Sequence, residues 1–223
     1  MKTLASLALC TLAISSLLLP ACGGDGTWNG ATGTPSPTTP PSGSATPNPL
    51  PPITVTSASF SNGQPIPQFY ACTVAGGQNS SFHISWNTPL PIGTGKLAII
   101  MDDETAPCGS GDNACVHWGV FNIPLSVSGL AAGINPSNVS PNIKLGQNYD
   151  GSTQYAGMCP ASGSGVHTYK VSVFALTGLA PNEPGGSSIT RSQFRSLYAA
   201  YLLGEGEISG TYDRDNPLIL PTP

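Results

Sequence analysis

The sequence predicts a mainly β domain with irregular loops, and three observations support this fold class. Several short segments alternate apolar with polar residues or form continuous apolar runs, as strands do. Proline and glycine, with 23 and 27 copies in 223 residues, stand at the joins between these segments, where they end regular structure. Only one segment has the residue spacing of an amphipathic helix. Together these features are typical of an all-β domain.

The strand-like segments are of two kinds. Residues 53–60 and 82–86 alternate apolar side chains with threonine, serine or histidine, which is typical of strands with one buried face. His83 lies inside the second of these segments and is expected to be structural. A continuous apolar run predicts a central strand at residues 96–101, and further strands are expected at residues 117–123, 169–176 and 207–212.

The one predicted helix starts at the segment Ser188-Ile189-Thr190. Thr190 is its expected N-cap, because a threonine hydroxyl can accept a hydrogen bond from the first free backbone N–H groups. Gly204 is expected to end the helix. Apolar and aromatic side chains recur between these limits at helical spacing, namely Phe194, Leu197, Tyr198, Tyr201 and Leu202.

The first 21 residues are predicted to be an export signal. Lys2 supplies a positive start, and residues 4–19 are apolar with small residues mixed in. This run is too short to span a membrane comfortably. It ends in Leu19-Pro20-Ala21-Cys22, which looks like a bacterial lipobox with Cys22 as the lipidated residue. Cleavage by an ordinary signal peptidase is the alternative, because proline is unusual at that position.

Residues 22–52 are predicted to be a tether, followed by a single folded domain at residues 53–223. The tether is almost entirely Gly, Pro, Ser, Thr, Ala and Asn and has no apolar periodicity, so it is not expected to form a core. A flexible chain of this length has a root-mean-square span of about 30 Å. We therefore expect a lipoprotein of the bacterial cell envelope, facing the periplasm or the cell surface, whose domain stands away from the membrane.

Charged residues are scarce in this chain. They make up 8% of it, against roughly 25% in an average soluble domain. Seven Lys and Arg residues set against eleven Asp and Glu residues leave no basic surface, so nucleic acid is not an expected partner. Four of the acids fall in one short segment before His117, either as part of a functional site or as a solvated acidic loop. They are Asp102, Asp103, Glu104 and Asp112.

The cysteines are consistent with export. With one cysteine inside the signal and Cys22 assigned to lipid, four remain in the domain, an even number that suits disulfides in an oxidising compartment. Three pairings are possible. The simplest closes a short loop between Cys108 and Cys115, and it then pairs Cys72 with Cys159. A zinc site is the competing interpretation, but no C-x-x-C motif is present.

The order of short motifs between residues 56 and 214 resembles the phosphatidylethanolamine-binding protein family, in particular its bacterial branch, often called Raf kinase inhibitor-like. The resemblance implies a large antiparallel sheet packed on a smaller one, with peripheral helices. Its motifs are spread over nearly the whole domain. They include Ser59 to Pro67, Ile84-Ser85-Trp86, Asp103 with Ala106-Pro107, His117-Trp118, Tyr155 to Gly163 with His167, and Gly210 to Arg214.

The same resemblance implies a pocket for phosphate-like anions and phospholipid head groups, whose ligand-binding residues would be Asp103, His117, Gly157, His167 and Tyr169. The chemistry fits, because a protonated imidazole donates a charge-assisted hydrogen bond to an anionic oxygen. Glycine allows a backbone N–H to approach closely, and a carboxylate can hold an imidazole nitrogen. The expected partner is a small phosphorylated or anionic ligand, bound without a cofactor or metal and without turnover.

Two departures from the family pattern concern charge. The usual Asp-Pro-Asp-Ala-Pro motif has Thr105 in place of its second acid, and the usual His-Arg pair has Thr168 in place of its arginine. An acid and a base are therefore lost together. This predicts that Thr105 and Thr168 lie near each other, where an ion pair would otherwise stand.

Other interpretations of the site residues stay open. Both histidines could be structural, or could join the carboxylate in a metal triad of the non-haem iron kind. A serine hydrolase is the enzymatic alternative, since Ser162 and Ser164 lie shortly before His167, but no G-x-S-x-G elbow precedes a helix. At the level of function, the alternative to a ligand-binding module is an interaction protein that engages another envelope protein and has a vestigial pocket.

Overall fold

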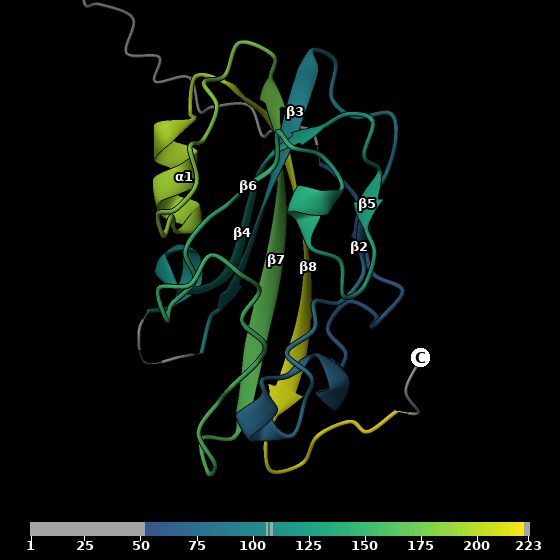
Figure 1. Cartoon of the computed structure of the whole chain (residues 1–223), viewed down its shortest axis with the longest axis vertical. Helices are drawn as coiled ribbons and strands as arrows, with labels where there is room; N and C mark the ends of the chain where they lie inside the picture. Colours follow the sequence, from purple (N-terminus) through teal and green to yellow (C-terminus); the bar gives the residue numbers. More distant parts are fainter. Residues whose placement is uncertain (1–51, 106, 108, 221–223) are drawn as a thin grey trace, which may run out of the picture. The chain divides into compact units, whose positions relative to one another are not determined.

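The structure is a computed structural model and describes residues 52–105, 107 and 109–220. These residues form two antiparallel sheets and one α-helix (Figure 1). The predicted fold class is confirmed. The large sheet has the order β6 (Lys144–Leu145), β4 (Cys115–Pro124), β3 (Thr94–Asp103), β7 (Val166–Thr177) and β8 (Leu202–Asp213). The small sheet has the order β1 (Val55–Thr56), β2 (Ile84–Trp86) and β5 (Gly129–Leu130).

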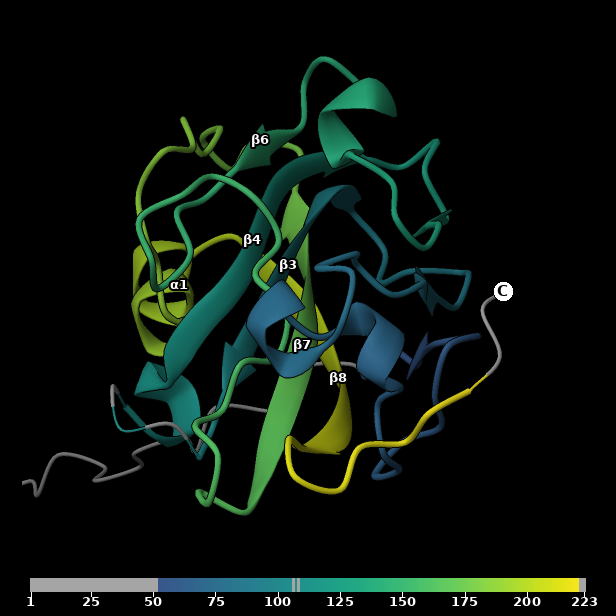
Figure 2. The ribbon, with the colours of Figure 1, turned by 60° about the horizontal axis from the view of Figure 1, so that its bottom comes forward.

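The helical elements are short. The one α-helix, α1 (Arg191–Leu197), lies against the face of the large sheet opposite the small sheet, as Figures 1 and 2 show. The 3-10 helices are η1 (Gln68–Tyr70), η2 (Thr73–Ala75), η3 (Gly111–Asn113) and η4 (Pro136–Asn138).

Strand β3 is buried on both faces, which explains its continuous apolar sequence. Leu97, Ile99 and Met101 face the small sheet and join the larger core cluster. Ile100 faces the other way and joins the smaller cluster beneath α1, where Phe194 of the helix packs among aromatic side chains of the sheet. The large sheet is therefore the middle layer of a three-layer domain.

The predicted helix is shorter than expected. Its start is confirmed, because Thr190 forms a capping box with Gln193. The helix ends at Leu197, however, and Leu202 already belongs to β8, where it pairs with Leu176 of β7. Leu202 packs on the same apolar cluster as the helix. Leu202 therefore keeps the helical spacing of the apolar residues before it, although its backbone is already a strand.

The first predicted strand is also shorter than expected, since only Val55–Thr56 pairs with β2. Beyond it, side chains replace the strand ladder: the backbone N–H of Ala58 donates to Nδ1 of His83 (3.0 Å), and the hydroxyl of Ser57 donates to the carbonyl oxygen of His83 (2.6 Å). His83 thus has the structural role that the sequence predicts.

A disulfide joins Cys72 to Cys159, the pairing predicted from the sequence, and it links segments 87 residues apart. Cys115 is also disulfide-bonded. Its predicted partner Cys108 lies outside the described residues, as do Cys22, the predicted signal and the tether up to residue 51. In the part of the chain that the structure describes, no helix is both long enough and apolar enough to cross a membrane.

Candidate functional site

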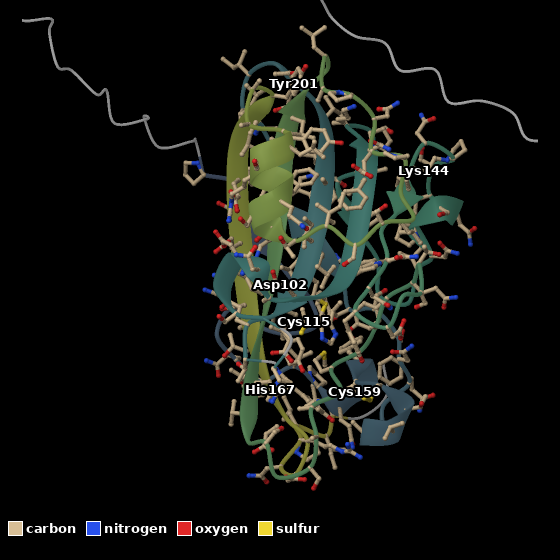
Figure 3. The ribbon with its side chains drawn as sticks, turned by 90° about the vertical axis from the view of Figure 1, so that its left-hand side faces the viewer. Asp102, Cys115, Lys144, Cys159, His167 and Tyr201 are labelled. Atoms are coloured by element: carbon tan, nitrogen blue, oxygen red, sulfur yellow. A yellow bond between two sulfur atoms is a disulfide. The ribbon has the colours of Figure 1, made fainter. Side chains whose placement is uncertain are left out.

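The acid-rich segment divides between the two faces of the large sheet, because successive side chains of a strand point to opposite faces. Asp103 pairs with Tyr169 of β7, and the Tyr169 side chain belongs to the core between the two sheets. The Asp103 side chain therefore points to that face. Asp102 points the other way and bonds Arg191 of α1. In Figure 3 the labelled Asp102 lies near α1, whereas His167 lies toward the lower end of the domain. Of these two acids, only Asp103 belongs to the site.

A β-bulge in β4 aims His117 at the site. Met101 of β3 pairs with Trp118, but Asp102 pairs with Val116, so His117 is an extra residue on β4 at this point. A bulge bends the strand locally and re-aims the extra side chain. The His117 ring therefore reaches the face that carries the aromatic side chains of β7.

Asp103 and His167 form a buried pair. Oδ2 of Asp103 lies 2.8 Å from Nδ1 of His167, and Oδ1 of Asp103 accepts a hydrogen bond from the backbone N–H of Thr105 at 2.9 Å. The side chains are 4% and 6% exposed. Because a carboxylate only accepts hydrogen bonds, Nδ1 of His167 must carry the proton of this bond.

His117 is held by the backbone. Its Nδ1 lies 2.9 Å from the carbonyl oxygen of Ala156, so Nδ1 carries a hydrogen and Nε2 of the neutral ring keeps its lone pair. Burial lowers the pKa of His117, although the Ala156 carbonyl and the Asp103 carboxylate act in the opposite direction. We therefore expect a neutral imidazole at neutral pH when the pocket holds no anion.

Tyr169 lies beneath both imidazoles. Its ring meets that of His117 edge to face at 5.2 Å and stacks on that of His167 at 6.4 Å, measured between centroids. Burial raises the pKa of its hydroxyl, and the nearby Asp103 carboxylate raises it further. The hydroxyl is buried and meets no partner at full hydrogen-bond geometry among the described residues, although the Asp103 carboxylate is close enough to interact with it. It is therefore a neutral donor at the base of the site.

Gly157 was predicted to bring its backbone N–H close to a ligand, but this N–H is bonded within the fold. Its backbone N–H donates to Oδ1 of Asn79 at 2.7 Å, so this group is not offered to a ligand. A Cβ at this position would lie 2.6 Å from the carbonyl oxygen of Tyr70 and from the backbone N of Cys72. The glycine is therefore needed for close packing against the segment after η1.

The site residues open into a pocket of about 610 Å³. Apolar groups form much of its wall, with a few polar groups converging on it, as in many small-molecule sites. Its lining includes Asp103, Thr105, His117, Tyr149, Ser164 and His167, with Cys159, Pro160 and Ala161 on the wall. Of the predicted site residues, the structure brings Asp103, His117 and His167 to this pocket, with Tyr169 behind them.

Thr105 and Thr168 lie next to each other, as the sequence predicts. The backbone N–H of Thr168 donates to Oγ1 of Thr105 at 2.9 Å. The two sequence positions at which the family pattern has an acid and an arginine are thus joined here by an uncharged hydrogen bond. The rim of the pocket is correspondingly short of charge at this point.

Two residues that line the pocket, Tyr149 and Ser164, were not among the predicted ligand-binding residues. The Tyr149 ring lies 4.6 Å from that of His117, but Tyr149 stands in a loop without any motif, so no sequence signal marks it. Oγ of Ser164 lies 3.1 Å from Nε2 of His167. Its position three residues before a candidate histidine was the available signal.

The opposite face of the sheet carries an ion network around a buried arginine. Arg191, whose side chain is 1% exposed, contacts Asp102, Glu104, Asp112 and Glu207 at 2.6 to 3.2 Å. Burial raises the pKa of Asp102 to about 6, although Arg191 opposes this shift. Three of the four acids before His117 are thus used to anchor α1 and η3 rather than to build the pocket.

The described residues contain no group of three or more His, Cys, Asp or Glu side chains that could hold a metal ion. The pocket has two imidazoles and one carboxylate, but the carboxylate and one imidazole nitrogen already bond each other. What the arrangement offers chemically is a set of hydrogen-bond donors and acceptors whose charge depends on the protonation of the imidazoles.

Comparison with known proteins gives a consistent result. Residues 56–213 match the profile of the phosphatidylethanolamine-binding protein family. A UPF0098 protein of Aquifex aeolicus is 36% identical over 161 residues, which cover 72% of this chain and 88% of that protein. A Mycobacterium tuberculosis protein that bears the name lipoprotein LppC is 28% identical, over 73% of each chain.

Two solved structures are similar to this domain. Escherichia coli YbcL, described as a member of the mammalian PEBP family, has a TM-score of 0.61 at 25% identity and covers 72% of this chain and 98% of its own. The phosphatidylethanolamine-binding protein homologue CT736 of Chlamydia trachomatis has a TM-score of 0.59 at 28% identity and covers 73% and 97%.

Proposed function

The chain belongs to the phosphatidylethanolamine-binding protein family, and from this premise we propose that it binds a small phosphorylated or otherwise anionic ligand in the pocket of Asp103, His117 and His167. The observation that carries the proposal is the convergence of two imidazoles on one pocket, with the buried Tyr169 ring packed behind them. The ligand class includes the head groups of phospholipids.

The imidazoles are the groups that would bind the anion. No Lys or Arg is found among the described residues that line the pocket, so positive charge there must come from protonated histidine. Protonation of His117 would add a hydrogen to Nε2 and make it a charge-assisted donor. Because burial lowers the pKa of His117, that proton must be taken up as the anion binds, and affinity should increase as the pH falls.

The experiment is a calorimetric titration of phosphoethanolamine into the wild-type domain and its His117→Ala and His167→Ala variants at several pH values. Each variant loses a charge-assisted hydrogen bond, so we expect affinity to fall by about ten- to a hundred-fold, equivalent to roughly 1.5–3 kcal/mol. His83→Ala is the matched control, since His83 is the remaining histidine and bonds the backbone outside the pocket. Equal affinity in all the variants would contradict the proposal.

The proposed setting of this pocket is the bacterial envelope, with the domain anchored by lipid at Cys22. Support comes from the apolar N-terminus that ends in Leu19-Pro20-Ala21-Cys22 and from the name of the LppC relative. Cys22→Ser in the full chain should abolish incorporation of labelled fatty acid and release the protein from the membrane fraction. Identical partitioning of the two forms would show that the anchor is wrong.

A further inference from the structure

Three side chains of the pocket form a continuous line of hydrogen bonds that anion binding does not require. Asp103 Oδ2 lies 2.8 Å from His167 Nδ1, and His167 Nε2 lies 3.1 Å from Ser164 Oγ. A hydroxyl within reach of a base, with the base oriented by a third group, is the signature of an activated nucleophile. We propose that Ser164 accepts acyl groups from small carboxylic esters, with His167 as its general base and Asp103 as a positioning residue.

The hydrogen positions agree with these roles. The Asp103 carboxylate accepts from Nδ1–H, so Nε2 of neutral His167 presents its lone pair to Ser164. This is the tautomer in which an imidazole removes a hydroxyl proton. The Ser164 hydroxyl has a second acceptor within reach, the Ala161 carbonyl oxygen at 2.7 Å. Rotation about the Cβ–Oγ bond moves the hydrogen from one acceptor to the other.

The loop before β7 exposes Ser164 to the pocket. Gly163 and Gly165 flank it with positive φ angles of 82° and 78°, a conformation that glycine adopts without strain. The serine is exposed and lines the pocket, whereas His167, three residues later, is buried in the sheet. An exposed hydroxyl thus lies beside a base held in a strand, next to the apolar wall formed by Pro160 and Ala161.

A second serine in the same loop lacks this geometry. The hydroxyl of Ser162 donates to Oδ1 of Asp215 at 2.7 Å, and Ser162 does not line the pocket. The two serines share a loop and a high exposure but differ in their partners. Ser162 is therefore a matched control for Ser164.

The reaction balances without any further reagent except water. Oγ of Ser164 bonds to the ester carbonyl carbon while its proton passes to Nε2 of His167. The bond from that carbon to the alkoxy oxygen then breaks, and the departing alcohol takes the proton from His167. Water, deprotonated by His167, attacks the acyl-serine, releasing the carboxylic acid and restoring the hydroxyl.

Turnover should be slow. The nearest backbone donors are already engaged, since the N–H of Gly163 donates to Oδ2 of Asp215 (2.6 Å) and the N–H of Ser164 to the Ala161 carbonyl oxygen (3.2 Å). A missing oxyanion donor costs about 10²- to 10³-fold in rate. Covalent capture of the serine is therefore a more sensitive readout than product release.

The test treats the folded domain with a fluorophosphonate, in which Oγ–P bond formation expels fluoride, and maps the adduct by mass spectrometry. We expect one adduct on Ser164 in the wild type and in Ser162→Ala, and no adduct in Ser164→Ala or His167→Ala. With p-nitrophenyl acetate, the same pair of active proteins should release p-nitrophenol in a burst. A wild-type protein that remains unlabelled, or is labelled elsewhere, would overturn the assignment.

Ser164→Ala keeps the experiment informative even if His167→Ala does not fold, because Ser164 is exposed and its truncation should leave the melting temperature unchanged. It also separates this inference from anion binding. Ser164→Ala should lose labelling whatever its affinity for phosphoethanolamine, because it removes the nucleophile and keeps both imidazoles. Labelling of Ser164→Ala at the wild-type rate would overturn the inference without bearing on the binding site.

Asp103 is tested through the pH profile of labelling. The titratable groups that face His167 are Asp103 from β3, His117 from β4, Tyr212 from β8 and Tyr169 from its own strand. A carboxylate stabilises the protonated imidazole, so Asp103→Asn should move the rise of the labelling rate to lower pH as well as reduce its maximum. A lower maximum with an unmoved profile would show that Asp103 does not position His167 in this way.

Discussion

Asp102 and Asp103 are neighbours in β3, yet their carboxylates lie in two different environments on opposite faces of the large sheet. Asp102 is sealed beneath α1, where Arg191 is shared among four acidic side chains. Asp103 bonds one imidazole at the edge of a pocket of about 610 Å³. Strand alternation thus assigns one acid of a consecutive pair to the anchoring of a helix and the other to the candidate pocket.

The two faces differ in whether their charged or chargeable groups are open to a ligand. On the α1 side, the guanidinium of Arg191 also donates to the backbone carbonyl oxygen of Gly111, so its donors are used within the fold, and its side chain is 1% exposed. On the pocket side, the imidazoles of His117 and His167 line a pocket of about 610 Å³. A ligand can therefore contact the imidazoles, whereas Arg191 is closed to it.

The largest expected effect comes from breaking the α1 side. Arg191→Met removes the shared cation and leaves Asp102 buried without its counter-charge, so we expect the free energy of unfolding to fall by about 3–5 kcal/mol. Urea denaturation measures this change. Arg195→Met is the control, because Arg195 is partly exposed and its loss should cost clearly less.

The same variant tests whether the two faces act separately. The Arg191→Met domain, measured below its unfolding midpoint, should bind phosphoethanolamine nearly as well as the wild type, because Arg191 does not line the pocket. A collapse of affinity with the fold intact would show that the ion network sets the geometry of the pocket, and the comparison drawn between the faces would fail.

A smaller effect is expected on the pH dependence of the free energy of unfolding, and Asp102 and His117 should change it in opposite directions. The folded pKa of Asp102 is raised to about 6, chiefly by burial, against about 3.9 for an unperturbed carboxyl. The folded state therefore binds this proton more tightly than the unfolded state. As the pH rises from about 4 to 6, this contribution to stability is lost, by at most about 1.4 kcal/mol per pH unit.

His117 should act in the opposite direction. Burial lowers its folded pKa, so as the pH falls below about 6.5 the unfolded state takes up the proton first and stability decreases. Urea unfolding of wild type, Asp102→Asn and His117→Gln across pH 4 to 8 separates the two contributions. Asp102→Asn should lose only the fall in stability between about pH 4 and 6, and His117→Gln only the fall in stability below about pH 6.5. Identical pH dependence in all three proteins would contradict both assignments.

The sequence was sufficient for the fold class and the main strands because their signals are local. The continuous apolar run of β3 and the alternation of apolar and polar residues in β2 follow from which side chains are buried. The Thr190 cap marks the start of α1. The helix end was mispredicted because Tyr201 and Leu202 keep an apolar spacing after the backbone has become a strand. Spacing alone does not distinguish these two cases.

The pocket was predictable only in part. Asp103, His117 and His167 were identified through motifs, but the orientation of His117 depends on a bulge that exists only once β3 and β4 pair. Arg191 and Asp102 meet across 89 residues of sequence, so no local pattern could have joined them. The engagement of Gly157 by Asn79 likewise arises from tertiary packing.

Nitrogen-detected histidine spectra test the binding proposal most directly, because the chain has three histidines and each would give its own signals. The domain, labelled with ¹⁵N in histidine, is titrated with phosphoethanolamine at constant pH. We expect the ring nitrogens of His117 and His167 to move toward the protonated pattern while those of His83 stay fixed. Movement of none of them, or of His83 alone, would contradict the account.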